Sequence, residues 1–409
     1  MTDLASSVLP MIRTRADLHR WSDANRHGML MHEAVDILEA AVADHAPQEI
    51  FAVTSKALAS SLTVIARSDD SSGIIGDACR RLLALHPVAA ARASAPVAPL
   101  VRWMITFQFA GEVDYFELDP VAYAPALGEE GLRKYRAELN RIAEGLGPNP
   151  PEEQRWSSAN AHVRFVLEWN ERRFAVLDKD VDAIIRTHLR DAEVAAWYQD
   201  TAEALVEVGE YSLAIDWAQR GAEFDGGHQA ARAADYWCEL LAQRRPSELV
   251  DARLTVFRRW PTAGHATALH EAAADRWNEY YEEVLSVLST RPAEAVNFAH
   301  SSLGDIQLAW SLAHTLSLND DRVWTSLAKS YAKIDPLAVL PVLTRLVDHD
   351  LTEAGAQHYI VAARRLKNMR RLAAGSPRAT QVDDYIKELR ETHRRRPRLQ
   401  REFDRAGLP

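Results

Sequence analysis

The chain has 409 residues, of which 47% are hydrophobic and 26% charged, so it can bury a sizeable core and still present a polar surface. Its formal net charge of −10 argues against a protein dedicated to nucleic acid. Only two cysteines occur, which excludes a disulfide framework and any four-cysteine metal cluster. No uninterrupted apolar run is long enough to span a bilayer, so we expect a cytoplasmic protein without a membrane segment.

The first 150 residues predict a series of helices, because apolar residues recur at helical spacing and alternating β-type runs are almost absent. Ser72 is the candidate N-cap of one helix, which we expect to stop at Pro87, since proline interrupts helical hydrogen bonding. The Pro-rich run 147–151 is the strongest breaker in the chain. It marks the end of a predicted N-terminal helical domain, 1–150. The candidate helices before it are 17–24, 31–42, 50–62, 72–86, 97–109 and 132–146.

A predicted loop, residues 112–120, holds four carboxylates and two aromatic rings, and a second acidic group occurs at 69–77. Carboxylates in such groups can bind Mg²⁺ or Ca²⁺, or act as acid and base. The alternative is structural, because Asp119-Pro120 is an ordinary helix start with Asp as the cap and Pro in the first turn. A third interpretation is an acidic loop that contacts a partner. Its candidate residues are Asp114, Tyr115, Glu117 and Asp119.

Residues 197–227 predict two amphipathic helices joined by a tight turn at Gly209, where glycine tolerates the left-handed conformation. Small residues in both helices would let the helix axes approach closely: Ala202, Ala214, Ala218 and Gly221. The segment resembles a tetratricopeptide repeat, a unit of about 34 residues with small residues in each helix and a Gly-x-Tyr turn. It departs from that pattern at Thr201-Ala202, where Leu-Gly is expected. The alternative is an ordinary helix pair.

After this unit, short helix-breaking segments recur at regular spacing. The predicted helices between them are about 12 residues long. Alternating short helices and short connections pack antiparallel and stack, as in an α-solenoid. We therefore predict a helical-repeat domain over 151–375. It is followed by a basic C-terminal helix or tail over 376–409.

Four segments carry a wider resemblance: the runs 69–77, 123–128 and 131–135, and the Arg-rich ending. They are similar to a group of bacterial all-helical repeat proteins of unknown function. They also resemble the helical region that follows a SWIM zinc finger in some larger proteins. A SWIM finger needs Cys-x-Cys and Cys-x-His, and neither pattern occurs here. The resemblance implies an all-α repeat fold over most of the chain, and it names no reaction.

The charge is unevenly distributed, because residues 361–409 contain 14 Lys and Arg against 6 Asp and Glu. Three interpretations of this basic ending stay open. It could contact nucleic-acid phosphates, dock on the acidic body of the same or a second copy, or form a solvated helix end. The pI of about 5.9 argues against a dedicated nucleic-acid binder. The candidate contact residues are Arg394, Arg395, Arg396 and Arg398.

The sequence lacks the glycine-rich phosphate loops and the nucleophile elbow of common enzymes. Ser326 and Lys329 match Ser-x-x-Lys, but the motifs that accompany it in known enzymes are missing. Pairs of histidines spaced by five residues do not share a helix face. We therefore expect no catalytic residue, no cofactor and no metal.

Together these features predict an all-α protein, an α-solenoid of stacked antiparallel hairpins of the tetratricopeptide or HEAT kind. We expect a non-catalytic binding module or scaffold for a protein or peptide partner, with self-association as a further mode. Two alternatives stay open. One is an enzyme or metal-dependent protein that uses the acidic loops 69–77 and 112–119. The other is a nucleic-acid-associated protein that acts through the basic C-terminal tail.

Overall fold

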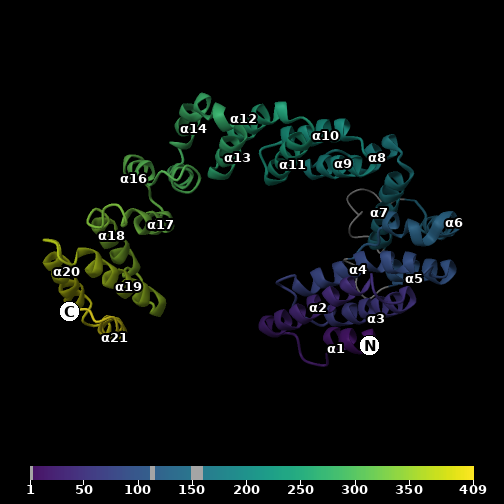
Figure 1. Ribbon diagram of the computed structural model, residues 1–409, viewed down its shortest axis with the longest axis horizontal. Coiled ribbons are helices and arrows are strands. Elements are labelled where there is room, and N and C mark those ends of the chain that lie inside the picture. Colours follow the sequence, from purple (N-terminus) through teal and green to yellow (C-terminus); the bar gives the residue numbers. More distant parts are fainter. Residues whose placement is uncertain (1–2, 111–115, 149–159) are drawn as a thin grey trace. The chain divides into compact units, whose positions relative to one another are not determined.

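The computed structural model describes residues 3–110, 116–148 and 160–409 (Figure 1). Helices make up 77% of the structure, and the described residues contain no β-strand beyond one isolated bridge, Leu18 to Ser68. The predicted all-α fold is confirmed. The chain divides into two compact units, Met1–Ala218 and Gln219–Pro409. The predicted boundaries at 150 and 375 do not coincide with this division.

The first unit is built by helices that pack on their neighbours in the chain. Helix α4 packs on α2, α3 and α6, and α7 packs on both α6 and α8. The apolar faces of α1 to α4 share one core, and α5 to α7 enclose a second. The helices are α1 Leu4–Ile12, α2 Trp21–Ala41, α3 Pro47–Ile65, α4 Ile74–Arg92, α5 Val97–Ala110, α6 Pro120–Gly145, α7 Ala161–Asp178, α8 Val181–Leu189 and α9 Ala195–Val208; α10, Tyr211–Phe224, begins in this unit.

The second unit continues the same pattern, because α11 packs on α12, α12 on α13, and α16 to α19 each on the next. This stacking of sequence neighbours is the predicted α-solenoid packing. None of the described helices is both long and apolar enough to cross a membrane. The helices are α11 His228–Arg244, α12 Leu249–Arg259, α13 Ala263–Ala273, α14 Tyr281–Leu288, α15 Pro292–Asn297, α16 Ile306–Thr315, α17 Asp321–Tyr331, α18 Leu340–Asp350, α19 Ala356–Ala373, α20 Ala379–Thr392 and α21 Pro397–Arg405, with short turns η2 Pro246–Glu248, η3 Ala274–Glu279 and η4 Phe298–Ser302.

Helix α4 differs from its prediction at both ends. It continues through Pro87 to Arg92, because Ala89 and Ala90 are fully buried and their burial offsets the hydrogen bond that proline cannot make. At its start, Gly73 rather than Ser72 is the N-cap, with a left-handed φ of 77°. The sequence pattern also does not predict α1, which is a short apolar helix.

The hairpin of α9 and α10 turns at Gly209, which has φ 90° and ends α9 as predicted. Its small residues Ala202, Ala214 and Ala218 are fully buried. The rings of Tyr198 and Trp217 connect the two helices, with centroids 5.8 Å apart. The burial expected for the hairpin's small residues is therefore observed.

Replacing Ala218 by leucine is expected to lower the free energy of unfolding by roughly 1–3 kcal/mol, because added methylenes overpack a filled position. Thermal melts of wild type and variant measure the change. The matched control is Ala231→Leu on α11, where the native alanine is half-buried. An unchanged midpoint for Ala218→Leu would contradict the close approach of the two helices.

Candidate functional site

The structure describes the acidic loop only from residue 116 onward, and Leu118 and Asp119 contact α7. Asp114 and Tyr115 lie outside the described residues. Glu117 is exposed. Asp119 is the N-cap of α6, where its Oδ1 accepts a hydrogen bond from the N–H of Val121 at 2.9 Å. The structural interpretation of Asp119-Pro120 as a helix start therefore describes Asp119 correctly.

Asp119 also pairs with Arg173, whose side chain is the centre of a three-helix ion-pair network. Arg173 is buried on α7. Its Nε and Nη2 each donate to Asp119 at 2.9 Å, and its Nη1 and Nη2 each donate to Glu207 on α9 at 2.8 Å. Such bidentate pairs fix orientation as well as distance. The network therefore holds the N-terminus of α6 against α7 and α9.

The second acidic group also has local structural roles. The carboxylate of Asp70 accepts hydrogen bonds from the N–H groups of Ile75 and Gly76 at the start of α4, at 2.9 and 2.8 Å. Asp77 pairs with Arg80 one turn later, at 2.7 Å. Across the residues that the structure describes, no group of three or more His, Cys, Asp or Glu side chains is placed to hold a metal ion.

The basic ending is folded onto its own unit, since Leu399 and Phe403 of α21 are fully buried and α21 packs on α19. Two of the four predicted contact residues have partners there. Arg394 pairs with Glu391 at 2.8 Å, and Arg396 donates to the carbonyl of Leu351 at the end of α18, at 2.7 Å. A cation at this position is favourable for the α18 dipole.

Arg395 and Arg398 are the two predicted contact residues that remain available. Both side chains are exposed. Neither forms a hydrogen bond or an ion pair with any residue in the described part of the chain. Their guanidinium groups can therefore contact an external anion without first breaking an internal contact.

Helix α19 carries a second set of cations, which the count over 361–409 includes but which the sequence pattern did not single out. It contains five Lys and Arg and no carboxylate. Arg365 and Arg370 face neighbouring helices and pair with Asp350 and Asp383, each at 2.7 Å. The remaining three are exposed and have no carboxylate partner among the described residues. They are Arg364, Lys367 and Arg371, which share one helix face at spacings of three and four.

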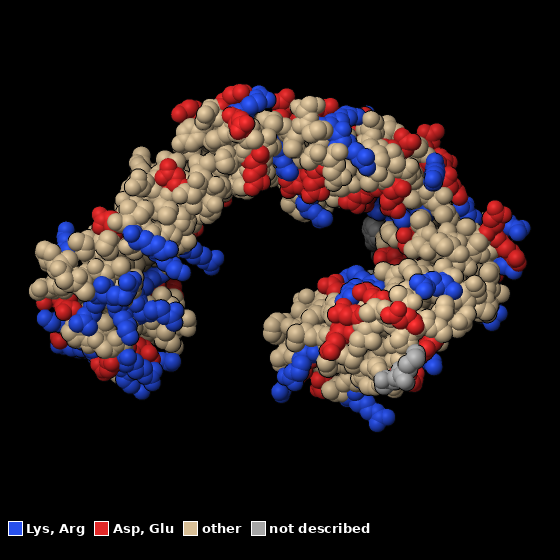
Figure 2. All heavy atoms as spheres, viewed as in Figure 1, with Lys and Arg blue, Asp and Glu red and all other residues tan. Residues whose placement is uncertain are grey.

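We define the basic surface as five exposed cations: Arg364, Lys367 and Arg371 on α19, Arg395 shortly before α21, and Arg398 on α21. The packing of α19 on α21 brings both groups to the same part of the second unit. Figure 2 shows Lys and Arg side chains gathered where α18 to α21 lie. In the sequence of α19, apolar core positions alternate with these cations. This pattern could have identified the surface.

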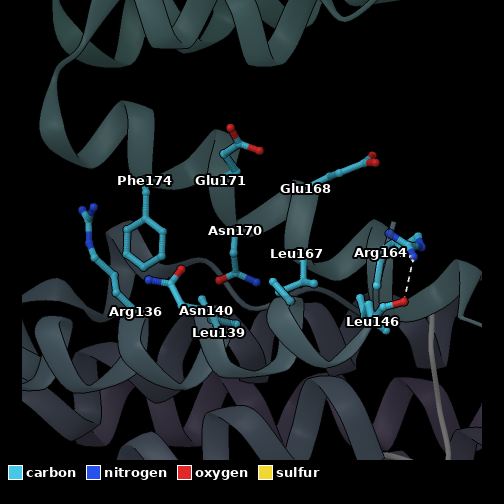
Figure 3. A pocket seen from close by; sticks show the side chains of 12 residues that line it. Arg136, Leu139, Asn140, Leu146, Arg164, Leu167, Glu168, Asn170, Glu171 and Phe174 are labelled. Carbon is cyan, nitrogen blue, oxygen red and sulfur yellow. Dashed lines mark hydrogen bonds between the residues drawn. The ribbon is translucent and has the colours of Figure 1, made fainter. Parts of the chain in front are cut away.

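A cleft of about 600 Å³ lies between α6 and α7, lined by polar and apolar side chains (Figure 3). Leu167, Asn170 and Phe174 point from α7 toward α6. Asn170 is buried, accepts from the hydroxyl of Tyr135 at 2.7 Å and donates to Gln108 at 3.0 Å. These buried polar groups therefore satisfy one another.

A Ser–His contact between α3 and α4, in which His86 is buried and Ser55 half-buried, was not anticipated, because the two residues are far apart in the sequence. His86 Nε2 lies 3.0 Å from Ser55 Oγ, and its Nδ1 lies 2.8 Å from the hydroxyl of Tyr123. The Ser55 hydroxyl also donates to the carbonyl of Phe51 at 2.7 Å. Ser55 then accepts from Nε2, and Nδ1 accepts from Tyr123. The ring is stacked on Trp103, with centroids 4.4 Å apart.

The partners of this contact favour a structural arrangement over a nucleophile and base. In the tautomer that satisfies every partner, Nε2 of His86 carries a proton, so it cannot take one from Ser55. Burial lowers the pKa of His86 to about 4, which keeps the ring neutral near pH 7. The contact therefore connects α3, α4 and α6 in the core of the first unit.

Comparison with known proteins adds one finding. A protein-family model matches residues 11–399, and its description is "Family of unknown function (DUF6880)". No curated protein matches the sequence.

Proposed function

Since the chain belongs to the family of unknown function DUF6880, we propose from its own surface that it is a non-catalytic helical-repeat module. In this proposal the module binds an acidic segment of a protein partner on the basic surface of α19 and α21. In this proposal the α9–α10 hairpin is a tetratricopeptide-like unit. It also places the protein in the cytoplasm, where buried free thiols such as Cys79 and Cys238 stay reduced.

The main support for the proposal is that the cations on the two faces of α19 differ in whether they have a carboxylate partner. Inward-facing Arg365 and Arg370 each have a carboxylate partner. Outward-facing Arg364, Lys367 and Arg371 have none in the part of the chain described. These three residues span about 10 Å of helix axis. Two or three carboxylates of a partner segment match that length.

A protein partner is favoured over nucleic acid by the charge of the whole chain. The total of −10 repels a polyanion that comes within about a Debye length, ~8 Å at physiological salt, and beyond that distance the repulsion is largely screened. A short acidic segment has few charges, so it experiences less of this repulsion. Base-stacking aromatic residues, which nucleic-acid surfaces combine with cations, do not occur on α19 apart from the buried Tyr359.

Neutralising the α19 cations is expected to weaken binding of a fluorescein-labelled Glu/Leu-rich peptide by about tenfold, since three close charge contacts are lost. The variant is Arg364→Gln with Lys367→Gln and Arg371→Gln. Fluorescence anisotropy at two salt concentrations measures affinity. The difference between variant and wild type should shrink at the higher salt, because exposed charge contacts are screened.

The matched control changes the same net charge elsewhere, by replacing Arg26, Arg80 and Arg141 with glutamine. Each of these exposed arginines pairs with a carboxylate in its own helix. If this control loses peptide binding to the same extent, the weaker binding comes from the net charge alone, and the proposal is wrong. A generic DNA duplex forms the second arm. Tight, salt-sensitive duplex binding that the α19 variant abolishes would favour the nucleic-acid alternative instead.

A further inference from the structure

A small pocket lies between α3, α4 and the start of α5, in the first unit. Its volume is about 220 Å³. Pockets for drug-sized ligands are larger, roughly 300–1,000 Å³, but a cavity of about 150 Å³ is enough to bind benzene. The size of this pocket therefore suits a single ring or a small fused ring. The lining side chains that matter for its chemistry are Phe51, Ser55, His86, Pro99, Leu100 and Trp103.

Three of the lining residues carry aromatic rings that contact one another. The ring of His86 is stacked on that of Trp103, and its centroid lies 5.2 Å from that of Phe51. Phe51 and Trp103 pack against both hydrophobic cores of the first unit, yet each side chain is only half-buried. A flat ring in the pocket would cover part of their exposed apolar surface, and aromatic rings pack favourably on one another.

The pocket selects against charged ligands. None of its lining residues, all of which lie in the described part of the chain, is Asp, Glu, Lys or Arg. Burial lowers the pKa of His86 to about 4, so this ring is neutral near pH 7. A charged ligand would lose hydration in the pocket without gaining a counterion, which is costly.

Ser55 supplies the pocket with one hydrogen-bond acceptor. Its hydroxyl donates to the carbonyl of Phe51 and accepts from Nε2 of His86. A hydroxyl oxygen has two acceptor lone pairs, so Ser55 can accept from one further donor. The other ring nitrogen of His86 contacts the hydroxyl of Tyr123. The polar part of the pocket therefore suits a ligand with one N–H or O–H group.

We propose that this pocket binds a small, neutral aromatic molecule with one hydrogen-bond donor, of the phenol or indole class. The ring of the ligand packs against Phe51 and Trp103, and its donor bonds to the hydroxyl of Ser55. This binding is separate from the proposed binding of an acidic segment. The pocket belongs to the first unit and the basic surface to the second, so either proposal can fail without the other.

Fluorine NMR on the full-length protein at pH 7 tests the proposal with four ring probes. The probe para-fluorophenol carries the donor, para-fluoroanisole lacks it, para-fluorobenzoate is an anion and para-fluorobenzylamine is a cation. We expect para-fluorophenol to bind with a Kd of about 1 mM, a weak affinity suited to so small a ligand. The anisole should bind about fivefold more weakly, because it loses one neutral hydrogen bond. Both charged probes should bind more weakly than the phenol by about tenfold or more.

Two variants place the probe in the pocket. Ala95 also lines the pocket, and Ala95→Met is expected to abolish binding of para-fluorophenol, because the longer side chain fills the space. Its matched control is Ala59→Met, at an exposed position on α3 outside the pocket, which should keep the binding. Ser55→Ala is expected to remove the preference for the phenol over the anisole. Its matched control is Ser60→Ala, a half-buried serine on the same helix, which should keep that preference.

Three outcomes would overturn the proposal. The first is a wild-type protein that binds none of the probes. The second is equal affinity for para-fluorophenol and any other probe, because the site then selects neither the donor nor the neutral charge. The third is unchanged binding of para-fluorophenol in Ala95→Met, with a melting curve that shows the variant folded, because the probe then binds elsewhere.

Discussion

Replacing Arg173 by methionine is expected to lower the free energy of unfolding by about 3 kcal/mol, the lower end of the range for breaking a buried ion pair. The variant leaves Asp119 and Glu207 without their shared cation. Their side chains are 35% and 43% exposed, so water compensates in part and the cost stays at that lower end. Methionine keeps much of the apolar volume of the arginine stem, so the loss reports the ion pairs.

Urea unfolding of the full-length protein, followed by circular dichroism, measures this loss. The matched control is Arg141→Met, which removes an arginine that is 72% exposed and pairs with Glu138 in its own helix. That change is expected to stay within about 0.5 kcal/mol of wild type. Equal midpoints for Arg173→Met and wild type would show that α6, α7 and α9 are held together by other contacts.

Lowering the pH from 7 to 5 is expected to destabilise the first unit by about 2 kcal/mol for each of two buried histidines, His86 and His188. Burial lowers the pKa of each ring to about 4, and for His188 the nearby Arg172 and Arg173 lower it further. In the unfolded chain both rings titrate near 6.5. The unfolded state therefore binds protons first. Stability is fully present above about pH 6.5 and is lost progressively as the pH falls to about 4.

Urea unfolding at several pH values between 7 and 5 tests this expectation, because most carboxylates stay ionised in that window. The variants are His86→Gln and His188→Gln. Each is expected to reduce the pH dependence by about half, and the double variant to remove most of it, since the two rings are in separate environments. Variants that keep the wild-type pH dependence would show that other groups cause the acid sensitivity.

Local chemistry in the sequence was enough to predict several features of the molecule. Apolar spacing predicted an all-α fold, because a helix buries one face and its period is visible in a single chain. Gly209 predicted the end of α9, and Asp119-Pro120 predicted the start of α6, because both act within a few residues of themselves. The basic ending was recognised from composition alone.

Contacts between helices were decided only by the tertiary structure. Arg173 lies 54 residues from Asp119 and 34 from Glu207, and no local pattern links these positions. Partners of this kind depend on which helix faces meet. That choice is a property of the packed core, whereas a cap or an amphipathic stripe is encoded within one helix.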